Sequence, residues 1–188
     1  MAPSLEHALP ASRGEVEKLD VRTVHARHAD FVWRSLQRLG VPRSDLEDAI
    51  QEVFVVVHRQ LHAFDGNAKV TSWLFAICLR IASNWRRLAR FRYETAAEGA
   101  YEAADTHASQ LEQLERAQTH RTLNQLLDSL EPDKRAILVM HEIEGASCDE
   151  IADVMGIPVG TVHSRLHRAR ADLREALART RARERSFK

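Results

Sequence analysis

Hydrophobic residues recur every three or four positions along most of the chain, which is the spacing of amphipathic helices. Before residue 93, this pattern predicts three helices, over about residues 14–39, 44–62 and 70–90. The second begins with Ser44 and Glu47, a spacing typical of a capping box. No segment alternates apolar and polar residues as a half-buried strand does. We therefore expect an all-α fold.

A second group of helical patterns follows residue 110. Leucines mark a helix over residues 111–130, and Pro132 suits the first turn of another that runs to about Ile143. Residues 94–110 contain no Leu, Ile, Val, Met or Phe, so they bury too little to offset their ordering entropy. We predict two small helical domains, residues 14–92 and 111–184, joined by a flexible acidic linker at residues 93–110.

The last two predicted helices carry the most specific pattern. Ser147 and Glu150 have the spacing of a capping box, and Gly156 suits the left-handed residue that ends a helix. The next helix has an apolar stripe that leaves its basic and polar side chains outward: His163, Ser164, Arg165, His167, Arg168 and Arg170. This arrangement is typical of a helix-turn-helix that reads a DNA major groove. The alternative is an ordinary helical hairpin with a solvated basic face.

Charge is unevenly distributed, although 27 Lys and Arg balance 27 Asp and Glu overall. Residues 72–92 hold five arginines and no acid, and residues 156–188 hold nine basic and three acidic residues. Between them, residues 93–155 hold four basic and fourteen acidic residues. Two basic segments separated by an acidic one indicate two separate contacts with a polyanion such as DNA.

The basic helix predicted at residues 70–90 mixes arginines with aromatic residues, which suits DNA strands whose bases are unstacked. Trp73 and Trp85 lie on its apolar stripe, which favours packing in the core. The candidate DNA contacts on the helix are Arg80, Asn84, Arg86, Arg87 and Arg90. In the loop before it, Asn67 and Lys69 are candidates for reading an extruded base.

The helix predicted at residues 44–62 has a polar cluster opposite its apolar stripe. Asp48, Gln51 and Glu52 fall at positions i, i+3 and i+4, so they share one face. This cluster can receive arginines from a protein partner. The alternative is a solvated helix face.

Other sequence features argue against metal, cofactor or catalytic chemistry. Cys78 and Cys148 lie among apolar residues, so we expect each thiol to pack as a small hydrophobe rather than form a disulfide or bind metal. His163 and His167 have the i, i+4 spacing of zinc ligands, but neighbouring arginines would repel a cation. We predict no enzymatic activity, cofactor or small-molecule substrate. No apolar run is long enough to span a membrane, and residues 1–20 lack the apolar centre of a signal peptide, so we expect a cytoplasmic protein.

With these motifs, the chain resembles a bacterial RNA polymerase sigma factor of the extracytoplasmic-function group, over about residues 25–178. The segment Asp48–Phe54 is similar to the family's polymerase-binding helix. The segments Trp73–Ile77 and Asn84–Arg87 are similar to its promoter-melting helix, and Gly156–Arg165 to its recognition helix. One departure is position 163, usually Lys or Arg in the family and His here.

The resemblance implies a factor that binds core RNA polymerase and directs promoter-specific transcription initiation. Asp48, Gln51 and Glu52 would then dock on the clamp helices of the largest polymerase subunit. The minus-ten promoter element would be bound by Asn67, Lys69, Arg80, Asn84, Arg86, Arg87 and Arg90. The minus-thirty-five element would be bound by Thr161, His163, Ser164, Arg165, His167 and Arg168. The resemblance also implies control by an anti-sigma factor, often a membrane-bound one.

Two rival hypotheses also use the helix-turn-helix. The first is a one-component transcription regulator that binds operators without recruiting polymerase. The second is a sigma mimic that sequesters an anti-sigma factor without touching DNA. Neither requires the acid-free, arginine-rich helix at residues 70–90, which favours the sigma factor.

Overall fold

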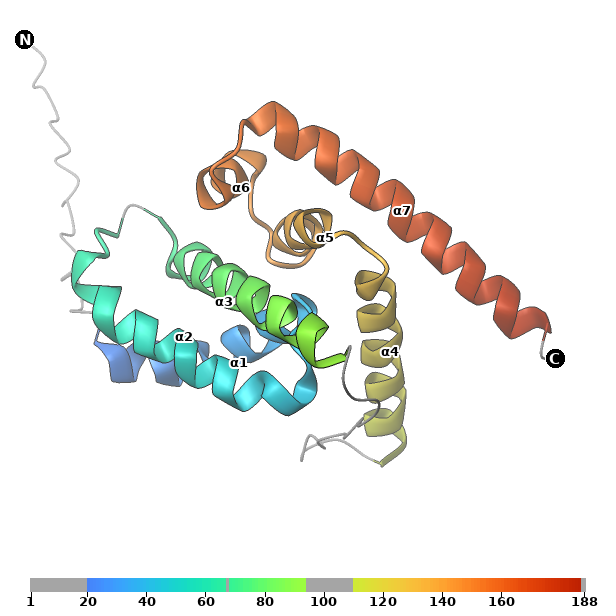
Figure 1. Cartoon of the computed structure of the whole chain (residues 1–188), viewed down its shortest axis with the longest axis horizontal. Helices are drawn as coiled ribbons and strands as arrows, with labels where there is room; N and C mark the ends of the chain where they lie inside the picture. The colour runs from blue at the N-terminus through green and yellow to red at the C-terminus, as the bar shows by residue number, and fades with distance from the viewer. Residues whose placement is uncertain (1–19, 67, 94–109, 187–188) are drawn as a thin grey trace, which may run out of the picture.

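The computed structural model describes residues 20–66, 68–93 and 110–186, and every regular element in these ranges is helical. The predicted all-α fold is therefore confirmed. The helices are α1 (Val21–Arg38), α2 (Leu46–Gln60), α3 (Val70–Tyr93), α4 (Gln110–Asp128), α5 (Pro132–Leu138), α6 (Cys148–Met155) and α7 (Val159–Ser186). Figure 1 shows α1–α3 as one group and α4–α7 as another, which we call the N-terminal and C-terminal units. The predicted linker lies outside the described residues, apart from the helical residues at its two ends.

The N-terminal unit packs three helices around an apolar core. Fully buried side chains from each helix meet there: Val24, Val32, Leu36, Leu46, Ala49, Val53, Val57, Leu74 and Cys78. The Asp20 carboxylate caps α1 by accepting a hydrogen bond from the Thr23 amide at 2.6 Å. Residues 14–19 of the predicted first helix lie outside the described residues. The predicted end near residue 39 is confirmed, since α1 ends at Arg38 and Gly40, two residues later, has a positive φ of 90°.

The capping box predicted at Ser44 and Glu47 is wrong. A 3-10 turn over Arg43–Asp45 precedes α2, so the residue before the helix is Asp45, whose side chain makes no capping bond. The Ser44 hydroxyl instead donates to the Asp45 carboxylate at 3.3 Å. Val41 and Leu46 are both buried, and fitting both into the core draws the residues between them into this tight turn. Tertiary burial therefore moves the helix start by one residue.

In the C-terminal unit, α5 and α6 both pack against α7. Its core contains buried residues from every helix of the unit: Leu127, Ala136, Ile137, Val139, Ile151, Val162, Leu166 and Ala169. Pro132 occupies the first turn of α5, as predicted. A π-helical turn, Val139–Ile143, continues α5 to the predicted end. Helix α7 runs to Ser186, beyond the last apolar position of its predicted stripe.

Among the described residues, no helix is both long and apolar enough to cross a membrane.

Candidate nucleic-acid interface

The predicted helix-turn-helix is formed by α6, a tight turn at Gly156 and α7. The Ser147 hydroxyl accepts from the Glu150 amide at 3.2 Å, while the Ser147 amide donates to the Glu150 carboxylate at 2.8 Å. This reciprocal pair is the capping box expected from the sequence. Gly156 ends α6 in the left-handed region, with φ of 63°. Local residue chemistry thus sets both ends of the first helix.

Burial of one stripe of α7 fixes which side chains point outward. Val162, Leu166 and Ala169 are almost completely buried, and Ile151 of α6 packs into the same core. The candidate minus-thirty-five contacts are exposed at His163, Ser164, His167 and Arg168 and partly exposed at Thr161 and Arg165. Positions 161, 164, 165 and 168 follow the spacing of one helix face. The structure thus brings Thr161, Ser164, Arg165 and Arg168 together, with His163 and His167 beside them.

Two arginines of α7 are held by acids of the same unit. The Arg165 guanidinium lies 2.8 Å from the Asp133 carboxylate of α5. Arg170 binds Glu142 of the π-helical turn at 2.6 Å, and this hydrogen bond is the main reason that the pKa of Glu142 is lowered. Both pairs lie at the surface, where a DNA phosphate can compete for the arginine.

His163 also contacts the helix that precedes it. Its Nδ1 lies 3.6 Å from the Cys148 sulfur at the start of α6, which ties the outward face of α7 to the first helix of the motif. Cys78, in contrast, is buried in the core of the N-terminal unit, and burial raises the pKa of its thiol to about 12. Both cysteines are free thiols in this structure. No three metal-ligating side chains gather among the described residues.

Helix α3 presents a second basic face. Arg80, Asn84 and Arg87 are exposed at the i, i+4, i+7 spacing of one stripe. Arg86 is instead half-buried, with its side chain beside Gly40 and its Nε 3.4 Å from the Ala82 carbonyl. The structure therefore separates Arg86 from the other three. The Arg90 side chain and Asn67 lie outside the described residues.

Lys69, the other loop candidate, is exposed at the start of α3. Its ammonium group lies 3.1 Å from the Glu150 carboxylate of α6, so it contacts the C-terminal unit. Phe64, from the same loop, packs on Trp73 with ring centroids 5.1 Å apart. As the sequence favoured, Trp73 and Trp85 both pack against the core.

The polar cluster on α2 is exposed at all three predicted residues, Asp48, Gln51 and Glu52. The Glu52 carboxylate accepts a hydrogen bond from the Trp85 indole at 2.9 Å, which connects this face to α3. Val55, 47% exposed, extends the face by one turn. Val55 was not predicted from the sequence, although its i+7 spacing from Asp48 places it on the same helix face.

Comparison with known families and proteins matches this architecture. The model of Sigma-70 region 2 matches residues 24–92, and that of Sigma-70 region 4 matches residues 120–173. The chain is 31% identical over 174 residues to RNA polymerase sigma-H factor of Pseudomonas aeruginosa, covering 88% of this chain and 89% of that protein. It is 32% identical over 166 residues to the ECF RNA polymerase sigma-E factor of Escherichia coli, covering 84% and 85%.

A longer relative matches as well. The chain is 36% identical over 155 residues to ECF RNA polymerase sigma factor SigE of Mycolicibacterium smegmatis, which covers 81% of this chain but spans only 60% of that protein. Among solved structures, it is similar to CnrH in complex with the cytosolic domain of CnrY, with a TM-score of 0.61, 25% identity and coverage of 84% of this chain and 87% of that chain.

The fold is also shared with the sigma factor RpoE of Bartonella quintana, solved in complex with the anti-sigma factor NepR. That likeness has a TM-score of 0.65 and 20% identity, and it covers 84% of this chain and 96% of that chain. The relatives matched over most of their length confirm the family expected from the motifs. The chain belongs to the extracytoplasmic-function (ECF) sigma factors of bacterial RNA polymerase.

Proposed function

We propose that this chain binds core RNA polymerase and directs it to initiate transcription at specific promoters. The observation that carries the proposal is the placement of three exposed faces on three different helices: acidic on α2, and basic on α3 and α7. A one-component regulator needs only the face on α7. In the proposed role the chain works in the cytoplasm and contributes binding energy rather than bond-making chemistry.

Each face has a proposed partner. Asp48, Gln51 and Glu52 dock on polymerase, where an exposed carboxylate pair suits arginines of the partner. The minus-ten strand is captured by Lys69, Arg80, Asn84 and Arg87, together with Asn67, Arg86 and Arg90, because arginine holds phosphates and unstacked bases. The outward face of α7 reads the minus-thirty-five element, since guanidinium and hydroxyl groups pair with base edges in a major groove.

Reconstitution with purified core polymerase tests this function. Adding the chain should form a stable complex and produce new, discrete start sites on genomic fragments from its source. Sequence-specific DNA binding by the chain alone, with no polymerase binding, would overturn the proposal in favour of a one-component regulator.

The docking face has a matched control on its own helix. Replacing Asp48 and Gln51 together by alanine should reduce polymerase affinity by roughly tenfold or more, because two central polar contacts are lost. Glu47→Ala removes another exposed acid beside the cluster and should leave affinity nearly unchanged. Equal affinities for the two variants would reject the docking assignment.

We also propose an anti-sigma factor as a regulatory partner. Family membership supports this proposal, as does the shared fold with RpoE, which was solved with NepR. A purified candidate that binds this chain should block its assembly with core polymerase. A binder that leaves assembly and initiation intact is not an anti-sigma factor for it.

A further inference from the structure

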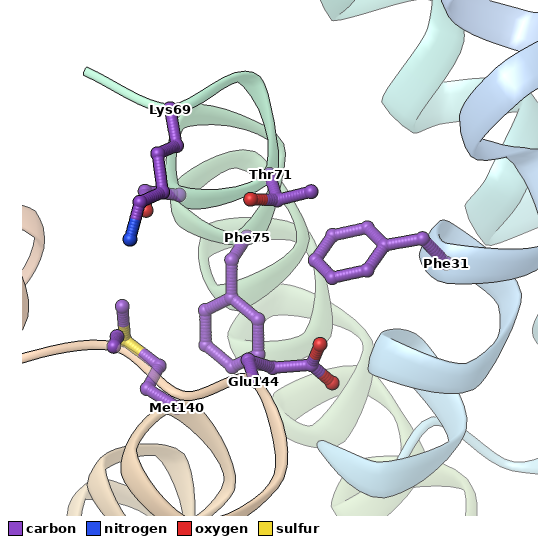
Figure 2. Close-up of a pocket in the computed structure, with 8 residues that line it drawn as sticks. Phe31, Lys69, Thr71, Phe75, Met140 and Glu144 are labelled. Atoms are coloured by element: carbon purple, nitrogen blue, oxygen red, sulfur yellow. The ribbon is translucent and has the colours of Figure 1, made fainter.

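Three large apolar side chains are exposed in the part of the chain that the structure describes. They are Val55 of α2, 47% exposed, Ile143 at the end of the π-helical turn, 36% exposed, and Val159 at the first position of α7, 40% exposed. Phe75 of α3 and Met140 of the π-helical turn provide the contrast, because they line the same small cavity and each is only 1% exposed (Figure 2). Val159 is the exposed residue that lies on the proposed recognition helix.

The outward face of α7 changes its chemistry along the helix. Two neighbouring rows of residues at the i, i+4, i+8 spacing form this face, and all six residues are exposed: Val159, His163 and His167, then Gly160, Ser164 and Arg168. The face is therefore polar and basic along most of its length but apolar at its N-terminal end. In a helix-turn-helix, the N-terminal residues of the second helix contact base edges in the major groove. The apolar end thus lies where base contacts are expected.

Nothing within the described chain requires a glycine at position 160. Gly160 lies in the first turn of α7 and has no positive φ, and a Cβ built on it meets no atom within 4 Å. Glycine stabilises a helix less than alanine does, so its use here has a cost to the fold. Glycine is favoured where a ligand must approach the backbone closely. The open space at Gly160 therefore indicates a surface that comes close to the helix from outside the chain.

The chemistry of the major groove identifies the group that suits this apolar end. Most groups on the base edges there donate or accept hydrogen bonds, and the bulky apolar group is the C5-methyl of thymine. The Val159 side chain has no hydrogen-bonding atom, but its methyl groups can pack against that thymine methyl. Because Gly160 has no side chain, the base edge can come close enough for this contact.

We propose that Val159 reads a thymine of the minus-thirty-five element through the C5-methyl group of the base, and that Gly160 leaves the room this contact needs. This inference rests on the proposed function and adds a specificity-determining residue to the candidate DNA contacts. The contact favours thymine over cytosine, which lacks the methyl group, at one position of the promoter.

Replacing thymine by deoxyuridine removes only the methyl group and tests the contact directly. Each thymine of the minus-thirty-five element in a mapped promoter is replaced in turn, and the affinity of polymerase carrying the full chain is measured. At one position the affinity should fall about fourfold, the effect of one buried methyl group. Polymerase carrying Val159→Ala should bind thymine and deoxyuridine at that position equally. The proposal is overturned if the wild type shows no loss at any thymine, if the element has none, or if Val159→Ala shows the same loss.

Two further variants control this experiment. Ile143→Ala removes a comparably exposed apolar side chain from the same unit, and it should keep the fourfold loss of the wild type. If this variant also becomes insensitive to deoxyuridine, the effect is not specific to Val159 and the assignment fails. Gly160→Ala adds a methyl group in open space, so the fold is retained, and it should lower affinity for the thymine-containing element. Unchanged affinity would refute the role of Gly160.

Failure of the proposed function gives a different result. If the chain does not bind polymerase, the same deoxyuridine series is made in a duplex that the full chain binds by itself. A loss there that depends on Val159 supports the thymine contact while the sigma factor role is rejected. A chain that binds neither polymerase nor any DNA overturns both proposals.

Discussion

The two helices that carry the candidate DNA contacts neutralise their cations in different ways. On α7, Arg165 is paired with Asp133 of the same unit. On α3, Arg80 and Arg87 have no ion pair with any residue that the structure describes, and Lys69 is paired with Glu150 of the other unit. The positive charge on α7 is therefore partly neutralised by an acid of the same unit. The positive charge at the start of α3 is neutralised only when the two units are in contact. DNA competes with an internal acid in the first case and with a domain contact in the second.

The largest effect on stability should come from a substitution in the core of the C-terminal unit. Ile151 is completely buried between α6 and α7, and Ile151→Ala should destabilise this unit by about 2–5 kcal/mol through lost burial and a cavity. Thermal unfolding followed by circular dichroism measures the loss. Val159→Ala, at a 40% exposed position of α7, should change stability by less than about 0.5 kcal/mol. Equal stabilities would contradict the packing described for α6.

Next in size is the loss of an arginine that is free of acidic partners in the described structure. Arg168→Ala should weaken binding to the minus-thirty-five element by about 1–3 kcal/mol if the guanidinium reads a base. A phosphate contact would instead lower the salt dependence by about one ion. Arg185→Ala, on the last turns of the same helix, is the control, and fluorescence anisotropy at several salt concentrations separates the outcomes. Identical losses for both variants would reject the assignment.

A smaller effect should follow from removing the acid that competes for Arg165. Asp133→Asn releases this arginine, and it should raise promoter affinity by about 0.2–1 kcal/mol, the range of exposed ion pairs. Asp172→Asn removes the same charge from a pair with Lys134 and is the matched control. If both variants strengthen binding equally, the general field of the unit is responsible and the local competition is refuted.

The smallest predicted effect is on the stability of the fold at acid pH. The pKa of Glu150 is lowered, first by the hydrogen bond from the Ser147 amide and then by Lys69. Because the folded pKa lies below the ordinary one, this stabilisation is complete above the ordinary range and is lost as pH falls below about 4. In denaturant unfolding, the free energy of unfolding of the wild type should therefore fall as the pH is lowered. It should fall less steeply for Glu150→Gln. Parallel profiles of stability against pH for the two proteins would show that Glu150 does not contribute to this decline.

The sequence predicted best those features that neighbouring residues determine. The Ser147–Glu150 capping box, the left-handed Gly156 and the outward stripe of α7 all depend on residues within a few positions of one another. The same spacing at Ser44 and Glu47 failed because burial of Val41 and Leu46 imposed a 3-10 turn. A local signal is therefore reliable only where tertiary packing does not oppose it.

The sequence pattern could not predict contacts between residues that are distant along the chain. Nothing near Arg135 indicates that it caps a helix almost a hundred residues earlier, and no periodicity marks the π-helical turn that redirects Glu144. Arg86 belongs to an acid-free basic run, yet it lies beside Gly40 because of the way α1 and α3 cross. These features depend on which helix faces pack against one another. The sequence pattern predicts only which face of each helix is apolar.

The contrast between the two thiols provides a built-in probe of the DNA-reading face. With a pKa of about 12 and no exposed surface, Cys78 does not react with alkylating reagents at neutral pH. The chain has only one other cysteine, Cys148, which is partly exposed beside His163. A fluorescent maleimide therefore labels the unmodified sigma factor at a single position. The rate of labelling at Cys148 then reports when promoter DNA covers α7.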